Sequence, residues 1–303
     1  MTHKKATLTG LIAIILWSAI VGLIRGVSEG LGAVGGAAMI YTLSALLLLL
    51  TVGFPKVKTF PRAYLLLGSL LFVSYEICLS LSLGYARSGT QAIEVGMVNY
   101  LWPSLTVLLS VFIARQKCSL LIVPGMAVSL VGIAKVLAGE HALSLAEIGN
   151  NIASNPLSYG LALAGAVIWA LYCVLTQKIA RGSNGITLFF MLTALALWIK
   201  YFSASQPEMI ITLPVLVSLA LAALAMGLGY AAWNIGILHG NVTLLATASY
   251  FIPVLSAMLA AWMLNASLSV NFWQGAGMVS LGSLLCWWST RTTAGVNVSG
   301  TSA

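Results

Sequence analysis

The sequence predicts an all-α integral membrane protein, in which ten transmembrane helices form two inverted five-helix repeats. Three observations lead to this fold class. The 303 residues are 60% hydrophobic and only 7% charged, whereas soluble domains carry roughly 25% charged residues. Ten apolar stretches, each about long enough to cross a bilayer, occupy most of the chain. The two halves of the sequence also resemble each other weakly at an offset near 150 residues.

The apolar stretches set the bounds of the helices, because about 20 helical residues cross a hydrocarbon core of roughly 30 Å. In chain order the predicted spans are Leu8–Ile24, Val34–Phe54, Ala63–Tyr85, Ala92–Ala114, Ser119–Leu137, Leu157–Leu175, Ile186–Phe202, Ile210–Leu238, Val242–Leu264 and Val270–Trp288. The first span resembles a signal peptide, but no A-x-A-like cleavage site follows it, so we expect an uncleaved helix. The eighth span is long enough to be tilted.

Basic residues indicate which side each loop faces, because cytoplasmic loops of membrane proteins carry an excess of Lys and Arg. Ten spans place both termini on one side, and that side holds Lys4, Lys5, Lys56, Lys58, Arg62, Arg115, Lys117, Lys178, Arg181 and Arg291. The opposite side holds Arg25, Arg87 and Lys200, with Lys135 just inside a span end. We therefore expect cytoplasmic termini and an external loop at 139–156, which contains no Lys or Arg.

Corresponding motifs in the two halves indicate an internal duplication. The matched elements are Tyr100-Leu-Trp-Pro103 with Tyr250-Phe-Ile-Pro253, Gly125 and Gly132 with Gly275 and Gly282, and Trp17 with Trp169. Five is an odd number, so two similar five-span halves must enter the membrane from opposite sides, as in many secondary transporters. We expect repeats at 1–138 and 157–291, joined by the loop at 139–156 and followed by a disordered tail at 292–303.

Two matched prolines give the most specific local signal. Proline inside a helix removes one backbone hydrogen bond and displaces the carbonyl four residues earlier, here those of Asn99 and Ser249. A carbonyl freed in a dry membrane needs a partner, which a side chain, a water or a substrate ammonium could supply. Interrupted helices at corresponding positions point to a transport site. We therefore expect hinges at Pro103 and Pro253, with simple shaping of helix packing as the alternative.

Polar and aromatic side chains gather in predicted spans 3, 4, 8 and 9, which are equivalent in the two halves. Asn and Ser inside a membrane helix prefer protein or water partners to lipid, so these spans are expected to border a cavity. The candidate substrate-binding residues are Trp17, Tyr75, Glu76, Asn99, Tyr100, Trp102, Pro103, Trp169, Trp233, Asn234 and Tyr250. Trp273, Trp287 and Trp288 are expected to be interfacial anchors, since Trp is enriched at membrane surfaces.

Glu76 and Glu94 are the only acids placed inside predicted spans. A carboxyl group within the membrane is costly and is a functional hypothesis by default. Glu94 lies near the end of its span, where Arg87 or Gln91 could satisfy it, so a structural role is favoured there. Glu76 lies deeper and has no partner nearby in sequence, which leaves a structural and a functional role open. It is the candidate carrier if protons are the coupling ion.

Several function classes lack their motifs. The sequence contains no Walker A, H-E-x-x-H or G-x-S-x-G motif, which disfavours an ATP-driven pump and an enzyme. The four cysteines show no C-x-x-C or metal-ligand spacing, so no metal site and no cofactor are expected. The net charge of +8 is explained by basic helix ends rather than by nucleic-acid binding. Membrane lipid and a small molecule are the expected partners.

Specific stretches resemble a known family of transporters. They are Ala13-Ile-Ile-Leu-Trp-Ser18, Val73-Ser-Tyr-Glu-Ile-Cys78, Glu94-Val-Gly-Met-Val-Asn-Tyr-Leu-Trp-Pro-Ser104, Tyr230-Ala-Ala-Trp-Asn234, His239-Gly-Asn-Val-Thr243 and Ser249-Tyr-Phe-Ile-Pro-Val-Leu-Ser256. With the five-plus-five arrangement, they resemble the EamA-type branch of the drug/metabolite transporter superfamily, and within it the bacterial aromatic amino-acid exporters. The resemblance extends to about Thr290. It implies a multi-pass protein of the bacterial inner membrane, with a central cavity lined by Tyr75, Tyr100, Trp102, Pro103 and Trp169.

The function implied by this resemblance is export of Phe, Tyr, Trp and other amino acids by alternating access. Efflux of lipophilic, paraquat-like cations is the alternative, because aromatic faces attract cations and Glu76 could add a counter-charge. An intramembrane enzyme or a non-transporting scaffold is a distant alternative. Uniport and proton antiport are both compatible with the sequence.

Overall fold

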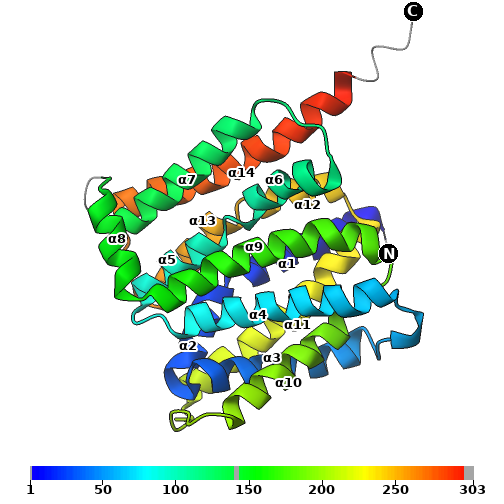
Figure 1. The fold of residues 1–303 in the computed structure, drawn as a ribbon. Helices are drawn as coiled ribbons and strands as arrows, with labels where there is room; N and C mark the ends of the chain where they lie inside the picture. Colours follow the sequence, from blue (N-terminus) through cyan, green and yellow to red (C-terminus); the bar gives the residue numbers. More distant parts are fainter. Residues whose placement is uncertain (1, 140–142, 297–303) are drawn as a thin grey trace, which may run out of the picture.

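The computed structural model describes residues 2–139 and 143–296, and these are helical with no β-strand (Figure 1). Their elements are α1 (His3–Ser18), α2 (Ile20–Leu31), α3 (Ala33–Thr51), the 3₁₀ turn η1 (Val57–Thr59), the π-helical η2 (Tyr64–Gly68), α4 (Ser69–Gly84), α5 (Gly89–Asn99), α6 (Trp102–Ala114), α7 (Ile122–Ala138), α8 (Leu145–Ser154), α9 (Pro156–Ile179), α10 (Ile186–Phe202), α11 (Leu213–His239), α12 (Val242–Ser249), α13 (Ile252–Met263) and α14 (Val270–Val296). The prediction of an all-α protein is confirmed for this part of the chain.

Each predicted span coincides with one helix or with two consecutive helices. The predicted span Ile186–Phe202 has the same bounds as α10. The first predicted span is longer than expected, because α2 continues to Leu31, and it is bent by 42° between α1 and α2. Ser18 donates its hydroxyl to the carbonyl of Ile14 at 2.8 Å, a side-chain bond that often bends helices.

Five helical stretches in the described chain are long and apolar enough to cross a membrane. They are Ala33–Thr51, Tyr64–Gly84, Gly89–Ala114, Pro156–Ile179 and Leu213–Gly236, and the bent pair α1 and α2 makes a sixth if it is counted as one span. Three shorter apolar helices are Ile122–Ala138, Ile186–Phe202 and Ile252–Met263. Apolar helices of this length are typical of a multi-pass membrane protein. The count of ten spans stays a prediction.

The two matched prolines start new helices instead of bending continuous ones. Helix α5 ends at Asn99 and α6 begins at Trp102, with Pro103 in its first turn. Likewise α12 ends at Ser249 and α13 begins at Ile252, with Pro253 in its first turn. Proline suits this position because its missing N–H has no partner within the first turn. The expected kinks inside helices are therefore breaks of two residues, after Asn99 and after Ser249.

The most extensive helix contacts join the first half of the chain to the second. These pairs are α7 with α14, α1 with α11, α3 with α10 and α4 with α9. Figure 1 shows α7 beside α14 along one edge of the bundle. The hydrophobic core is a single cluster that runs through these contacts from α2 to α14.

Glycines allow α7 and α14 to approach closely. A Cβ atom built on Gly132 of α7 would lie 2.7 Å from the carbonyl oxygen of Gly275 on α14. A Cβ atom on Gly275 would lie 2.5 Å from the carbonyl oxygen of Gly132. Gly125 and Gly282 meet in the same way further along the crossing. Each glycine thus contacts the counterpart of the other glycine on its neighbour, Gly132 with Gly275 and Gly125 with Gly282, which is the small-residue packing common between membrane helices.

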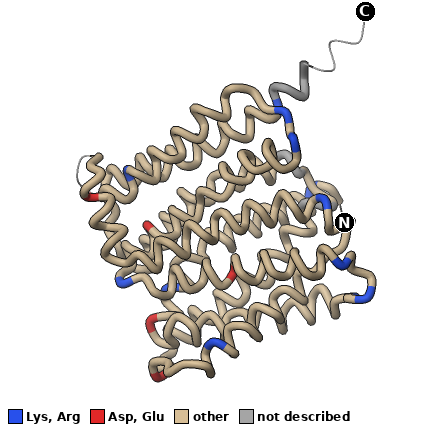
Figure 2. The backbone as a smooth tube through the Cα atoms, in the orientation of Figure 1, with Lys and Arg blue, Asp and Glu red and all other residues tan. Residues whose placement is uncertain are grey.

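Charged residues concentrate at the two ends of the bundle. Figure 2 shows most Lys and Arg at the end where the N-terminus lies, and most acidic residues at the opposite end or between the ends. The long helical surfaces between these ends carry few charges and expose many large apolar side chains. This distribution is what a bundle surrounded by lipid requires.

Two segments differ from the sequence prediction. The external loop expected at 139–156 contains the helix α8, whose apolar and polar residues lie on opposite faces, although residues 140–142 lie outside the described part. The tail expected to be disordered from residue 292 is helical as far as Val296, because α14 continues to that residue. Residues 297–303 of the predicted tail are also outside the described part.

Candidate functional site

A cluster of aromatic rings lies where helices of the two halves meet. We call it the aromatic cluster, and its members are Trp17, Phe72, Tyr75, Trp102, Trp169, Tyr172, Tyr230 and Trp233. Trp169 of α9 is its most connected member, with ring centroids 4.4 Å from Tyr75 and 4.9 Å from Tyr172. Phe72 of α4 contacts Trp169, Tyr172 and Tyr230 at 5.5–5.9 Å. Such contacts contribute about 0.5–1.5 kcal/mol each beyond the burial of area.

The aromatic cluster contains two Trp–Tyr pairs that each join the halves. Trp17 of α1 lies 5.0 Å from Tyr230 of α11, measured between ring centroids. Trp169 of α9 lies 4.4 Å from Tyr75 of α4. In the repeats predicted from the sequence, Trp17 corresponds to Trp169 and α4 to α11, although the offset of about 150 residues places Ala225, and not Tyr230, opposite Tyr75. Each half thus contributes one tryptophan that contacts a tyrosine of the other half.

Glu76 lies beside the aromatic cluster and is fully buried. Its two carboxyl oxygens accept hydrogen bonds from the hydroxyls of Tyr230, at 2.7 Å, and Tyr41, at 2.6 Å. Ser80 in turn donates to the Tyr41 hydroxyl at 3.0 Å. The carboxyl group thus connects α4 with α3 in the first half and with α11 in the second. It forms no ion pair with any residue of the described ranges.

The helix break after Asn99 packs against α9. The side-chain amide of Asn99 is buried and donates to the carbonyl of Ala162 at 3.3 Å. Gly165 makes room for this amide, because a Cβ atom there would lie 2.9 Å from its nitrogen. Trp102 follows the break and lies 6.3 Å from Trp169, with the two rings perpendicular. Asn99 and Trp102 therefore position the break on the helix that carries Trp169.

Four other candidates lie around these groups. Trp233 contacts Trp17 at 5.3 Å between ring centroids, and Pro103 is buried in the first turn of α6. Tyr100 and Asn234 are half-buried on the first break and on α11. Tyr250 lies apart from the aromatic cluster and contacts Trp287 of α14 at 6.0 Å. The structure thus gathers Trp17, Tyr75, Glu76, Trp102, Trp169 and Trp233, while Tyr250 belongs to a second group.

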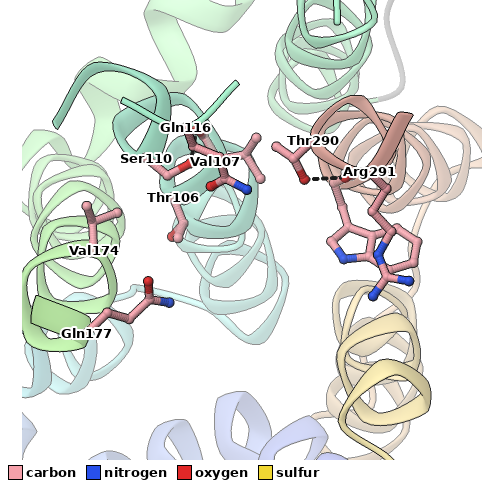
Figure 3. A pocket seen from close by; sticks show the side chains of 9 residues that line it. Thr106, Val107, Ser110, Gln116, Val174, Gln177, Thr290 and Arg291 are labelled. Carbon is pink, nitrogen blue, oxygen red and sulfur yellow. Dashed lines mark hydrogen bonds between the residues drawn. The ribbon is translucent and has the colours of Figure 1, made fainter. Parts of the chain in front are cut away.

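Trp287 of that second group borders a cavity of about 540 Å³ between α6, α9 and α14. Its lining residues are Thr106, Val107, Ser110, Gln116, Val174, Gln177, Trp287, Thr290 and Arg291. Figure 3 shows Thr106, Ser110 and Gln116 on one wall, opposite Thr290 and Arg291, with Val174 and Gln177 on a third side. The guanidinium carbon of Arg291 lies 4.2 Å from the centroid of the Trp287 ring.

None of the candidate residues predicted from the sequence lines this cavity. Trp287, which is predicted to be an interfacial anchor, is half-buried in the cavity wall, and its place relative to the membrane surface stays a prediction. The cavity nevertheless adjoins the predicted site, because the Thr106 hydroxyl donates to the carbonyl of Trp102 at 2.7 Å. A polar space therefore begins one helical turn from the aromatic cluster.

Glu94 is satisfied by partners distant in sequence rather than by Arg87 or Gln91. Its carboxyl group accepts from the Tyr159 hydroxyl at 2.6 Å and from the Asn151 amide at 3.1 Å. Asn151 also donates to the carbonyl of Leu137 at 3.0 Å. These bonds attach α8 to α5, α7 and α9, so the contacts of Glu94 are those of a structural residue.

Residues 156–288 match the model of the EamA-like transporter family. The chain is 62% identical over 291 residues to the aromatic amino acid exporter YddG of Salmonella typhimurium (strain 14028s / SGSC 2262), a match covering 96% of this chain and 99% of that protein. It is 63% identical, with the same coverage, to the aromatic amino acid exporter YddG of Escherichia coli (strain K12). A solved crystal structure of a protein 24% identical in sequence superimposes with a TM-score of 0.66, covering 96% of this chain and 99% of its own, which shows a shared fold.

Proposed function

Because the chain belongs to the family of the aromatic amino acid exporter YddG, we propose that it exports Phe, Tyr and Trp from the cytoplasm by alternating access. Its relatives are exporters, so the protein is a transporter and not an enzyme. We place it in the bacterial inner membrane, with both termini in the cytoplasm. The concentration of Lys and Arg at the end of the bundle that holds the N-terminus supports this orientation (Figure 2).

The proposed architecture is ten spans in two inverted repeats, at 1–138 and 157–291. The contacts between helices support it, because they come in pairs that an exchange of the halves interconverts. The contact of α1 with α11 becomes that of α9 with α4, and the contact of α6 with α9 becomes that of α13 with α1. The pairs α3 with α10 and α7 with α14 are each unchanged by the exchange. This is the pattern expected of a pseudo-two-fold axis between the repeats.

Labelling of single cysteines tests this topology. Lys58 and Glu147 are exposed, at a loop on the N-terminal side and on α8. In a variant without the four native cysteines, we expect Lys58→Cys to react with a membrane-impermeant maleimide only after the cytoplasmic face is opened. Glu147→Cys should react in intact cells whose outer membrane has been permeabilised. Labelling of both positions from the same face would contradict the inverted arrangement.

We propose that the aromatic cluster, together with the two helix breaks, forms the substrate site. The observation that carries this assignment is a pair of similar contacts, Trp17 with Tyr230 and Trp169 with Tyr75, in each of which a tryptophan of one half meets a tyrosine of the other. Both contacts cross the interface between the repeats, which is where inverted-repeat transporters bind their substrates. Relative motion of the halves must change both of them. A substrate ring inserted among these side chains would replace ring contacts of the same kind.

A neutral site of this kind also suits the two ends of a zwitterion. The indole N–H of Trp17 is buried and has no acceptor among the described residues. A buried donor without a partner costs about 1–3 kcal/mol, and a substrate carboxylate would supply the missing acceptor. Backbone carbonyl oxygens at a helix break can accept hydrogen bonds from an ammonium group. We therefore assign substrate contacts to Trp17, Tyr75, Glu76, Asn99, Tyr100, Trp102, Pro103, Trp169, Trp233 and Asn234, with hinges at Pro103 and Pro253.

Replacing Trp169 with alanine tests the site. The change removes five ring contacts of the aromatic cluster at once, each contributing about 0.5–1.5 kcal/mol. We expect uptake of labelled Phe into inverted membrane vesicles to fall at least about tenfold, since 1.4 kcal/mol corresponds to a factor of ten. Trp288→Ala is the matched control, because Trp288 is 58% exposed. Full activity of Trp169→Ala would contradict the assignment.

A further inference from the structure

The cavity between α6, α9 and α14 has a lining unlike that of the aromatic cluster. Arg291 is the only charged residue among the nine that line it, and no acid is present. Gln116, Gln177 and three hydroxyl side chains supply neutral hydrogen-bonding groups, while Trp287 and two valines supply apolar surface. A volume of about 540 Å³ falls within the range of small-molecule sites, roughly 300–1,000 Å³. The lining combines what a carboxylate, an ammonium group and an aromatic ring each require.

The position of the cavity relates it to the transport path. Arg291 and Gln116 lie at the end of the bundle to which the basic residues assign the cytoplasm. At its inner side, Thr106 is hydrogen-bonded to the backbone of Trp102, and Trp102 contacts Trp169 of the aromatic cluster. A molecule in the cavity would thus be on the cytoplasmic side of the substrate site and one helical turn away from it.

We propose that this cavity is a cytoplasmic vestibule of the transporter, in which Arg291 binds the carboxylate of an aromatic amino acid before the amino acid reaches the aromatic cluster. The proposal rests on the proposed function and on its orientation. Trp287 holds the guanidinium group at 4.2 Å from its ring, and an arginine stacked in this way can still bind a carboxylate through the edge of its planar group. The carboxamides of Gln116 and Gln177 can accept from the ammonium group.

The charge of Arg291 also separates classes of ligand. A cation in the vestibule would meet the like charge of Arg291, and none of the nine lining residues is an acid, so lipophilic cations are disfavoured as ligands here. A carboxylate is favoured, and so is a phosphate of a lipid headgroup, since arginine binds both. An amino acid that has lost its carboxylate charge should lose the benefit of Arg291 while keeping its ring and ammonium contacts.

The test is transport from the cytoplasmic face in inverted membrane vesicles and in proteoliposomes. For Arg291→Gln we expect the KM for labelled Phe to rise about tenfold or more with a nearly unchanged maximal rate, because a hydrogen bond to a charged group is lost. L-phenylalaninamide lacks the carboxylate, so its inhibition constant for this transport should differ less than about twofold between Arg291→Gln and the parent. Arg291→Lys should be intermediate, because it keeps the charge without the planar group.

Controls distinguish the possible failures. Arg62→Gln removes an exposed positive charge on the same side of the bundle but outside the cavity, and its KM should equal that of the parent. A parental KM for Arg291→Gln, or an equal loss for Phe and phenylalaninamide, would overturn the proposal. Disappearance of the effect in proteoliposomes of phosphatidylcholine alone would assign Arg291 to anionic lipid and also overturn it. Absence of saturable Phe transport by the parent would instead contradict the proposed function itself.

Discussion

Replacing Gly275 with leucine is expected to prevent stable assembly of the two halves. A Cβ atom at this position would lie 2.5 Å from the carbonyl oxygen of Gly132 and 2.8 Å from a methyl group of Val136. The nearest obstacle is backbone, which cannot rotate away, so α7 and α14 would have to separate along their whole crossing. Overpacking in protein cores costs typically 1–3 kcal/mol, and we expect at least about 3 kcal/mol here. Detergent-purified protein should show a large fall in thermal midpoint or aggregate on gel filtration.

A glycine on the same helix provides the control. A Cβ atom on Gly277 would meet nothing within 4 Å. Gly277→Leu makes the same change in helix propensity and in volume as Gly275→Leu, but it projects into open space. We expect its thermal midpoint to equal or exceed that of the parent, since leucine is a better helix former than glycine by up to about 1 kcal/mol. Equal stability of the two variants would show that the close crossing of α7 and α14 is not required.

Replacing Glu76 with alanine is expected to have the second largest effect. The substitution leaves the hydroxyls of Tyr41 and Tyr230 buried without their acceptor, at a cost of about 1–3 kcal/mol for each. The connection between α3, α4 and α11 is lost at the same time. We expect a lower thermal midpoint and less than about a tenth of the parental Phe transport, if the loss in the transport-competent state exceeds 1.4 kcal/mol.

Glu76→Gln separates the hydrogen bonds from the charge. The amide keeps one carbonyl oxygen as acceptor, so Glu76→Gln should recover most of the stability that Glu76→Ala loses. The stability of Tyr230→Phe should resemble that of Glu76→Gln. A glutamine cannot carry a proton. If Glu76 couples export to protons, Glu76→Gln should retain Phe counterflow and lose its response to a pH gradient. An unchanged response would exclude Glu76 as the carrier, and unchanged efflux of lipophilic cations would exclude it as their counter-charge.

The positions of most helices follow from the sequence because lipid imposes one rule on the whole chain, a long apolar run without charge. Ile186–Phe202 is a clear example, since Gly185 precedes it, its one charged residue, Lys200, lies in its last turn, and a polar stretch follows it. The breaks are predictable in place but not in form. Pro103 and Pro253 indicate an interruption, yet whether the helix bends or restarts depends on what packs beside it, here the α9 backbone that accepts from Asn99. The bend at Ala19 has no proline or glycine beside it in the sequence. We attribute it to the hydroxyl of Ser18, which donates to the carbonyl of Ile14.

The site is predictable only where a residue is unusual for its surroundings. Glu76, Trp17 and Trp169 stand out in apolar helices, and the structure brings them together. Phe72 does not stand out, because phenylalanine is ordinary in a membrane helix, although it contacts three members of the aromatic cluster. Polar residues at the ends of spans, such as Gln177, are equally ordinary. From the sequence, Arg291 therefore indicates only the orientation of the chain. The cavity that it lines cannot be predicted, because it arises from the packing of α6, α9 and α14.

In the proposed repeats, the crossings of α3 with α10 and of α7 with α14 each join a helix to its own counterpart. A helix surface that packs against a copy of itself allows two copies of one polypeptide to assemble without a different partner. If the repeats arose by duplication, an ancestor of half this length, inserted into the membrane in both directions, could have closed the same bundle as an antiparallel dimer. Fusion of the two copies then freed each half to diverge, so that residues such as Glu76 could appear in one half alone.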